Sequence, residues 1–428
     1  MVLVSRNANT GKGCAARGQS LVHTVGRPAR REPFCDAARV RILIVYDCLF
    51  PYTVGGGERW LRGVALRLAA DGHEVSYLTL RQWDPGVHPD LPGVRVITAG
   101  PRMALYADGR RRILPPLAFG AGALWHLLRH GRRYEVVHTG AFPFFSLLAA
   151  AAARPLHRFA LVAEWYEVWT LDYWQGYVGR AGGRVGHAVQ RLCARVPQRA
   201  ICFSRLHARR LRDEGVRGEI VLLEGMYAPA EGSLPAQSPS PATGEVVFAG
   251  RHIPEKRVPE LVDALVDARN RLPQLCAVIF GDGPQRPEVL RRIAAADAGE
   301  WLLAPGFVAA SELDEHLRGA LCMVLPSSRE GYGIIVVEAA AAGVPSVVVA
   351  GPDNAAVELI EEGVNGTVAP SASAADLADA IVRVAAAGAA LRAKTAAWFA
   401  ANAERLSVDS SLRTLAATYT TGLPSARA

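Results

Sequence analysis

Short apolar runs alternate along the chain with stretches of helical periodicity. Arg41–Tyr46 is rich in branched apolar residues and predicts a buried strand, whereas Glu58–Ala70 places apolar residues every three or four positions, as an amphipathic helix does. Asp71 and Gly72 end that helix, and Glu74–Leu80 is a second predicted strand. Strand, glycine loop, helix, turn and strand in this order form a βαβ unit, which predicts two parallel strands.

The same alternation continues toward the end of the chain. Further strands are predicted at Tyr134–His138, Phe159–Glu164, Arg199–Ser204, Glu245–Ala249, Cys276–Phe280, Leu321–Leu325 and Ser346–Val349. Further helices are predicted at Phe144–Ala153, Pro259–Arg271, Glu288–Ala296, Ile334–Ala342, Ala374–Ala386 and Trp398–Thr420. We therefore predict an α/β protein with doubly wound parallel sheets.

Residues 229–244 interrupt this alternation. The segment is rich in proline and serine and has no periodicity, which is typical of a linker. It divides the chain into a first domain over residues 39–228 and a second over 245–397, and residues 398–428 are predicted to form a helix that packs back on the first domain, with a tail. Ligands of such sheets bind beyond the carboxyl ends of the strands, so we expect the site in the cleft between the domains.

Composition narrows the class of protein. Of the 428 residues 50% are hydrophobic and 21% charged, which excludes a disordered chain. The longest uncharged apolar candidates, Leu117–Leu128 and Phe142–Ala153, are shorter than the roughly 20 residues of a membrane-spanning helix. Residues 1–38 are polar and lack the apolar segment of a secretory signal, so we expect a disordered extension. The seven cysteines are scattered without metal spacing, which predicts reduced thiols and a cytoplasmic protein.

The charge is distributed unevenly. Residues 1–225 carry 32 basic and 17 acidic residues, whereas residues 226–428 carry 16 and 23. The basic half indicates an anionic partner, either an acidic acceptor or the inner face of an anionic membrane, with Arg110–Arg112 and Arg129–Arg133 as a candidate patch. A general abundance of arginine is the alternative, since only three of the 48 basic residues are lysines. Aromatic interleaving is missing from the patch, so nucleic acid is not an expected partner.

The segment Pro326–Ala340 combines the residues of a ligand site. It follows a predicted strand and opens a predicted helix, so Glu330 lies at the carboxyl end of the strand beside Gly331 and Gly333. Glycines let backbone N–H groups approach a ligand, and a helix start suits a phosphate. Glu338, just over one turn into the helix, reaches a hydroxyl of the same ligand. Two glutamates eight residues apart are common, but in this setting they predict a polyhydroxylated, phosphorylated ligand.

A second group of candidate ligands follows the strand that ends at Ala249. Arg251 stands just past that strand and Lys256 begins the next helix, where two cations neutralise a diphosphate. Because lysine is rare in this chain, we interpret Lys256 as a phosphate-binding residue. The alternative is a solvated basic turn. Gly281 follows the neighbouring strand and predicts a tight turn at the same edge of the sheet.

These segments together resemble the retaining glycosyltransferases of family 4, which have the GT-B fold of two Rossmann-like domains. The resemblance runs from residue 40 to about residue 420. The order and spacing of the motifs carry it, since each motif alone is weak. The motifs are Gly55–Glu58, Gly72–Val75, Gly250–Arg251 with Lys256, Gly281–Pro284, Gly306–Val308, Pro326–Ala339, Ala342–Pro345, Asp353–Asn354 and Asn365–Gly366.

The resemblance implies a role for the residues that match these motifs. Arg251 and Lys256 would neutralise the diphosphate of a nucleotide-sugar donor, Glu330 would contact the transferred sugar, and Glu338 would hold the ribose. The residues implied to bind the donor are Gly250, Arg251, Lys256, Gly281, Phe307, Val308, Glu330, Gly331, Tyr332, Gly333, Ile334 and Glu338. The chain has no Asp-x-Asp motif, so neither a metal nor a further cofactor is expected.

The resemblance also implies an acceptor side in the first domain, where aromatic faces stack on a sugar or another ring. The implied residues are Gly55, Gly56, Gly57, Glu164 and Tyr166. Ordinary core packing is the alternative for the aromatic cluster Glu164–Trp169. Many relatives carry two histidines after a first-domain strand, whereas here Gly140 replaces the second. We include His138 with Glu330, Lys256 and Arg251 among the catalytic candidates, with a core histidine as the alternative.

The predicted function is therefore retaining transfer of a sugar from a UDP- or GDP-linked donor to a lipid, a glycan or a small metabolite. Two other functions stay open. A glycan phosphorylase of the same architecture needs a lysine that carries pyridoxal phosphate, and the second domain offers only Lys256 and Lys394. A catalytically impaired nucleotide-sugar-binding subunit is suggested by Gly140, although Glu330 and Arg251 are intact.

Overall fold

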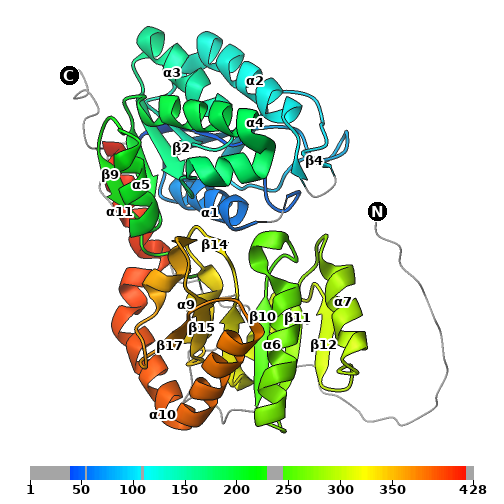
Figure 1. Ribbon diagram of the computed structural model, residues 1–428. Coiled ribbons are helices and arrows are strands. Elements are labelled where there is room, and N and C mark those ends of the chain that lie inside the picture. The colour runs from blue at the N-terminus through cyan, green and yellow to red at the C-terminus, as the bar shows by residue number, and fades with distance from the viewer. Residues whose placement is uncertain (1–38, 54, 108–109, 229–243, 421–428) are drawn as a thin grey trace, which may run out of the picture. The chain divides into compact units, whose positions relative to one another are not determined.

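The structure is a computed structural model that describes residues 39–53, 55–107, 110–228 and 244–420 (Figure 1). Two parallel sheets, each with helices packed against it, make up most of these residues. This confirms the predicted α/β class and the two Rossmann-like sheets. The predicted extension and the predicted linker, apart from Gly244, lie outside the described residues, and the predicted domain boundaries stay predictions.

The first sheet has seven strands in the order β3-β2-β1-β6-β7-β8-β9, and every neighbouring pair is parallel. Its strands are β1 (Arg41–Val45), β2 (Glu74–Thr79), β3 (Val94–Thr98), β6 (Val136–Gly140), β7 (Ala160–Trp165), β8 (Arg199–Cys202) and β9 (Ile220–Leu222). The helices of this half are α1 (Gly56–Ala70), α2 (Leu114–His130), α3 (Phe145–His157), α4 (Leu171–Ala194) and α5 (Arg205–Asp213), and a small hairpin consists of β4 (Tyr106–Ala107) and β5 (Arg110–Arg111). The strand order reverses between β1 and β6, which is where such sheets place their ligands.

The second sheet has six strands in the order β12-β11-β10-β13-β15-β17, again all parallel. Its strands are β10 (Glu245–Ala249), β11 (Cys276–Phe280), β12 (Leu302–Gly306), β13 (Cys322–Leu325), β15 (Ser346–Val349) and β17 (Gly366–Ala369). Its helices are α6 (Val258–Arg271), α7 (Arg286–Ala295), α8 (Ala310–Gly319) and α9 (Ile334–Ala341), and β14 (Arg329–Glu330) pairs with β16 (Asp353–Asn354).

Two C-terminal helices follow the second sheet. α10 (Ala374–Leu406) is kinked at Gly388, and α11 (Val408–Thr420) begins two residues after α10 ends. The backbone of Tyr227 pairs with both helices, because its N–H donates to the Leu406 carbonyl (3.0 Å) and its carbonyl accepts from the Val408 N–H (2.8 Å). The tail predicted as one helix is thus two, and the second lies against the first sheet's half of the chain.

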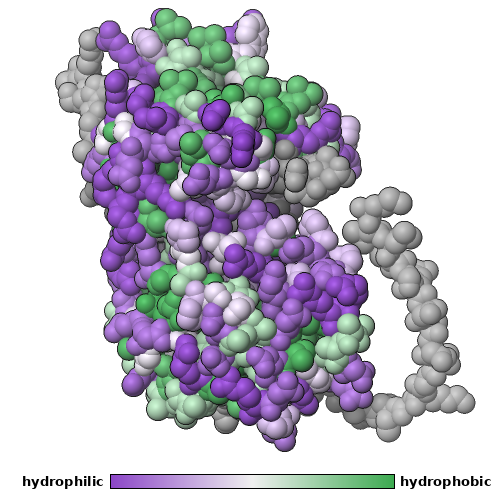
Figure 2. Space-filling model, viewed as in Figure 1, coloured by the Kyte–Doolittle hydropathy of each residue, from purple (hydrophilic) through white to green (hydrophobic). Residues whose placement is uncertain are grey.

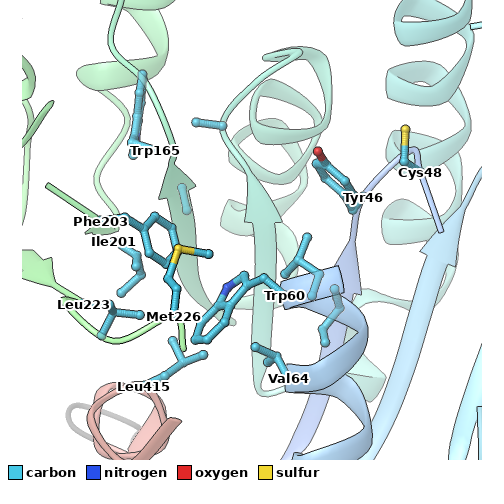
Figure 3. Close-up of a cluster of buried hydrophobic side chains, with 14 of the residues drawn as sticks. Tyr46, Cys48, Trp60, Val64, Trp165, Ile201, Phe203, Leu223, Met226 and Leu415 are labelled. Carbon is cyan, nitrogen blue, oxygen red and sulfur yellow. The ribbon is translucent and has the colours of Figure 1, made fainter. Parts of the chain in front are cut away.

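The core beside α11 is formed by large apolar side chains. Figure 3 shows Trp60 of α1 next to Met226 and to Leu415 of α11, and all three are buried in one cluster. Burial of residues of this size stabilises a fold by about 1.5–3 kcal/mol each, so α11 is an integral part of the first half. Among the described residues, no helix is both long enough and apolar enough to cross a membrane.

Candidate active site

Three glycines lie side by side where β10, β11 and β12 end. The Gly281 N–H donates to the Gly306 carbonyl (2.8 Å), and the Gly250 N–H donates to the Phe280 carbonyl (3.2 Å). Gly281 has a φ of +115°, and a Cβ there would overlap the Gly250 carbonyl oxygen, so the position requires glycine. The structure thus brings Gly250 and Gly281 together at one edge of the sheet, as the sequence predicted.

The loop after β10 is held by backbone bonds to the loop after β11. The N–H of His252 donates to the Asp282 carbonyl (2.8 Å), and the His252 carbonyl accepts from the Gln285 N–H (2.9 Å). The His252 side chain is fully buried, whereas Arg251 beside it is exposed. A short 3₁₀ turn, Pro254–Lys256, then carries the lysine. A fixed loop therefore presents both predicted phosphate-binding cations.

Lys256 and Glu330 form an ion pair. The Glu330 side chain is only 11% exposed, and its Oε1 accepts a hydrogen bond from the Lys256 ammonium and another from the Ser327 hydroxyl (2.7 Å). A carboxylate this deeply buried needs such partners, because an unpaired buried charge is strongly destabilising. The residues predicted for the phosphate and for the sugar are therefore neighbours, and Ser327 is a contact that sequence reasoning missed.

The start of α9 is built from tightly packed glycines. Gly333 has a φ of +97°, and a Cβ there would lie 2.6 Å from the Ala356 Cβ. A Cβ on Gly331 would lie 2.7 Å from the Tyr166 carbonyl oxygen, so the acceptor-side segment and this loop are in contact. Tyr332 is buried, and its hydroxyl donates to the Glu224 carbonyl. The Tyr332 side chain is thus anchored, which leaves its backbone for the predicted donor contact.

Glu338 and Ile334 lie on α9 itself and are partly buried. Burial raises the pKa of the Glu338 carboxyl to about 7, and the nearby Arg59 guanidinium offsets part of this shift. Glu338 is therefore close to half ionised at neutral pH. Phe307, predicted to flank a nucleotide base, is 70% exposed, and Val308 beside it is partly buried. An apolar ring this exposed is available for stacking.

The first-domain glycines Gly55, Gly56 and Gly57 start α1. The backbone of Gly55 caps the helix in an extended conformation without a side-chain hydrogen bond, and Gly56 is exposed with open space where a Cβ would be. A Cβ on Gly57 would lie 3.3 Å from the Tyr166 ring. The helix start therefore lies beside Tyr166, and the Glu58 carboxylate of its first turn lies against Gly55.

Glu164 lies at the centre of a buried polar network. It is fully buried, and its carboxylate accepts hydrogen bonds from the Trp60 indole (2.7 Å) and from the Tyr166 hydroxyl. With these donors in place, Glu164 links the Tyr166 side chain to α1. Glu164 as an acceptor-binding residue stays a prediction.

His138 belongs to the same network. β6 extends to Gly140, two residues beyond the predicted end, so His138 lies in the middle of the strand and is fully buried. Its Nδ1 shares a hydrogen bond of 2.5 Å with the Tyr419 hydroxyl, and its Nε2 lies 3.0 Å from Glu164 without hydrogen-bonding alignment. The predicted position at the strand's carboxyl end was wrong, and the structure favours the core histidine of the two alternatives.

Arg329, which sequence reasoning missed, lies beside Glu330 and joins residues from both halves of the chain. Its guanidinium pairs with Glu167 and with Glu255 (3.4 Å), and it stacks over the Tyr173 ring at 4.5 Å. The Tyr173 hydroxyl in turn donates to Glu255 (2.9 Å). Adjacency to Glu330 was the only sequence signal for Arg329, because its partners come from distant segments.

A pocket is lined in part by Tyr332. Its walls include Phe203, Leu222 and Leu359 together with the charged side chains of Arg205 and Arg405. Apart from Tyr332, the pocket contains none of the residues predicted to bind a donor. We therefore do not assign the donor to it.

Family models match the two halves of the chain in order. A model described as Glycosyltransferase Family 4 matches residues 54–224, and one described as Glycosyl transferases group 1 matches residues 235–404. Glycogen synthase of Mycobacterium tuberculosis is 27% identical over 325 residues, which are 72% of this chain and 77% of that protein. A GDP-mannose-dependent alpha-(1-6)-phosphatidylinositol monomannoside mannosyltransferase of the same organism is 36% identical over 148 residues, or 32% of this chain and 37% of that protein.

Solved structures share the fold over most of the chain. Sucrose-phosphate synthase from Thermosynechococcus elongatus superimposes with a TM-score of 0.69 at 19% identity, over 89% of this chain and 98% of that chain. Anabaena HepE in complex with UDP superimposes with a TM-score of 0.66 at 19% identity, over 89% of this chain and 100% of that chain. These two likenesses establish the fold alone. Together with the two family models, they show that the chain is a glycosyltransferase of the GT-B fold and belongs to group 1, family 4.

Proposed function

We propose that the protein transfers a sugar with retention of configuration from a UDP- or GDP-linked donor. The observation that carries the proposal is the ion pair between Lys256 and Glu330 at the carboxyl edge of the second sheet. A cation for the diphosphate and a carboxylate for the sugar hydroxyls are then held side by side, close to the start of α9. This is the arrangement that a donor with a charged leaving group requires.

The reaction we propose takes place on one face of the sugar. The bond from the anomeric carbon to the phosphate oxygen breaks, the acceptor oxygen bonds to the same face, and the acceptor proton passes to the departing phosphate. Arg251, Lys256 and the N–H groups at the start of α9 stabilise the negative charge that develops on that phosphate. We propose that no metal takes part, since side-chain cations supply this charge.

Other donor groups have separate binding residues in this proposal. Glu338 accepts hydrogen bonds from the ribose hydroxyls, and Phe307 with Val308 flanks the base. The choice between UDP and GDP stays open, because HepE has been solved with UDP-glucose at 18% identity while a relative is named for GDP-mannose. We propose that the loop with Phe307 and Val308 determines whether UDP or GDP binds, because the two donors share the diphosphate and the ribose and differ in the base.

The acceptor is proposed by class. The relatives are named for acceptors as different as glycogen and a phosphatidylinositol mannoside, so a glycan, a lipid or a small metabolite remain candidates. We place the acceptor beside Tyr166 at the start of α1, although the Tyr166 hydroxyl donates to Glu164 and its ring stacks on Phe203 at 5.1 Å between ring centres. We place the reaction in the cytoplasm, where nucleotide sugars are made available.

A screen of nucleotide sugars tests the proposal. Thermal shift with UDP- and GDP-linked sugars identifies the donor, and mass spectrometry of reactions with candidate acceptors identifies the product. Transfer, or donor hydrolysis without an acceptor, supports the enzyme. Donor binding without either reaction would instead support the alternative prompted by Gly140, an impaired nucleotide-sugar-binding subunit.

A further inference from the structure

The outer face of α2 carries an apolar stripe. Leu114, Leu117, Trp125 and Leu128 are spaced three, eight and three residues apart, which places them on one side of the helix. All four are exposed, and Trp125 is 59% exposed. Ala121, also exposed, fills the gap between Leu117 and Trp125. Large apolar side chains gathered in this way on a surface mark an interaction site.

The stripe is not needed to hold α2 in place. The opposite face of the helix is buried through Pro115, Phe119, Ala123 and Leu127, and it packs on α3 so closely that a Cβ on Gly120 would lie 2.5 Å from the Phe145 Cβ. α2 is therefore apolar on both its buried and its exposed side. A surface helix normally presents polar residues to solvent, so the exposed apolar stripe indicates that a partner covers this side of α2.

The stripe continues onto the end of α3. The His157 imidazole lies 3.2 Å from the Leu128 carbonyl, and Leu156 beside it is 62% exposed. Figure 2 shows hydrophobic residues gathered at the end of the first half of the chain where Figure 1 places α2 and α3. The apolar surface is thus broader than a single helix.

Arginines surround this surface, and acidic residues are missing from it. The sequence from Arg112 to Arg133 contains four arginines, Arg112, Arg129, Arg132 and Arg133, and no aspartate or glutamate. All four are exposed, and the Arg129 guanidinium stacks over the Trp125 ring at 3.8 Å from its centre. The partner that complements such a face is apolar inside and anionic at its boundary.

We propose that α2 docks the protein on an anionic lipid surface. Leu114, Leu117, Trp125 and Leu128 enter the boundary between headgroups and acyl chains, while the arginines at the ends of the helix bind lipid phosphates. An amphipathic face with tryptophan, leucine and flanking arginines binds membranes in this way, lying in the plane of the interface. A second copy of this chain fits less well, because the arginines of two facing copies would repel each other.

This inference goes beyond sugar transfer, because docking is the same whichever acceptor the enzyme uses. The charge of the chain alone predicts an anionic partner and leaves an acidic acceptor and a membrane open; docking through α2 selects the membrane. It also assigns that partner to α2 and the end of α3, away from Lys256 and Glu330.

Vesicle co-sedimentation of the full chain tests the proposal. Vesicles of phosphatidylcholine with phosphatidylglycerol should bind the wild type at least tenfold more strongly than vesicles of phosphatidylcholine alone. The double variant Trp125→Ser/Leu128→Ser should lose at least tenfold in binding to the anionic vesicles, because two apolar side chains no longer leave water. Arg129→Gln/Arg132→Gln/Arg133→Gln should lose on the order of 100-fold at low salt, since each cation near such a surface contributes about 1 kcal/mol.

Leu290→Ser is the matched control, because Leu290 is an exposed leucine beside Arg291 on α7, in the other half of the chain. It should bind vesicles as the wild type does. Equal binding to neutral and anionic vesicles, or unchanged binding by the stripe variants, would overturn the proposal. A wild-type dimer that Trp125→Ser/Leu128→Ser makes monomeric, with no vesicle binding by either protein, would show a self-association face instead. Donor hydrolysis in solution should be unchanged in every variant, which separates docking from the proposed reaction.

Discussion

Lys256 forms an ion pair with the Glu330 carboxylate in the structure, and in the proposed reaction it also neutralises the donor diphosphate. Removing a cation aimed at developing negative charge typically costs about 10²–10³ in rate. We predict a loss of this size in kcat for Lys256→Ala, measured by steady-state kinetics. Lys394, an exposed lysine on α10, is the matched control, and Lys394→Ala should leave kcat unchanged.

A double-mutant cycle separates the two tasks of Lys256. If the lysine acts on the phosphate, Lys256→Ala/Glu330→Gln should be slower than either single variant. If Lys256 only holds Glu330 in position, the double variant should match the slower single variant. That second result would remove the direct role that we give Lys256 in neutralising the leaving group.

Glu338 gives donor binding a dependence on pH. Burial raises the pKa of its carboxyl to about 7, so the ionised fraction rises as the pH rises from 6 to 8. A carboxylate accepts hydrogen bonds from ribose hydroxyls with both oxygens only when ionised, so donor affinity should increase over this range by up to about tenfold. Calorimetric titration with a nucleotide sugar at each pH measures the donor affinity. The diphosphate diester of the donor does not titrate near pH 7, so the pH dependence comes from the protein. Glu338→Gln should bind weakly with a flat pH profile, and a wild-type affinity that falls with rising pH would contradict the assignment.

A buried polar contact connects α11 to the first sheet. The Tyr419 hydroxyl is the hydrogen-bond partner of His138 Nδ1, and both side chains are almost completely buried. Tyr419→Phe leaves the imidazole nitrogen without a partner, which should lower the free energy of unfolding by about 1–3 kcal/mol. Urea unfolding followed by tryptophan fluorescence measures this. Thr414→Ala, at an exposed position of the same helix, should change it by less than about 0.5 kcal/mol. Equal stability of the two variants would contradict the role of this contact.

Elements with a clean hydrophobic pattern were predictable from the sequence. The strands β10, β11 and β15 agree with the predicted ranges at both ends, because each is a short apolar run between turn residues. α2 was missed because it is apolar on two faces and so shows no helical period. α4 was missed because glycines, including Gly179 at its kink, interrupt its pattern.

The candidate site was predictable where ligand residues are close in sequence. The segment around Glu330 and the loop around Lys256 follow strand ends, and parallel strands bring their carboxyl ends to one edge. The surroundings of His138 and Glu164 were not predictable, because their partners Tyr419 and Trp60 come from distant helices. A two-residue extension of one strand was enough to turn His138 from a predicted edge position into the core.

Segments from both halves of the chain meet at the candidate site. Tyr166 of the first half touches Gly331, and Arg329 of the second half pairs with Glu167. The residues that we propose for the donor and for the acceptor are therefore in contact, so an acceptor bound at Tyr166 would lie close to a sugar bound at Glu330. This proximity is what attack on the same face as the leaving phosphate requires.

The anomeric configuration of the first product distinguishes retention from inversion. The donor found by the nucleotide-sugar screen, if α-linked, is mixed with acceptor and enzyme in the presence of EDTA, and the anomeric proton of the product is followed by NMR. We predict that an α-linked product forms first and at an unchanged rate, because retention and side-chain cations need no metal. A β-linked first product would contradict retention, and a reaction abolished by EDTA and restored by Mg²⁺ would contradict the role of Arg251 and Lys256.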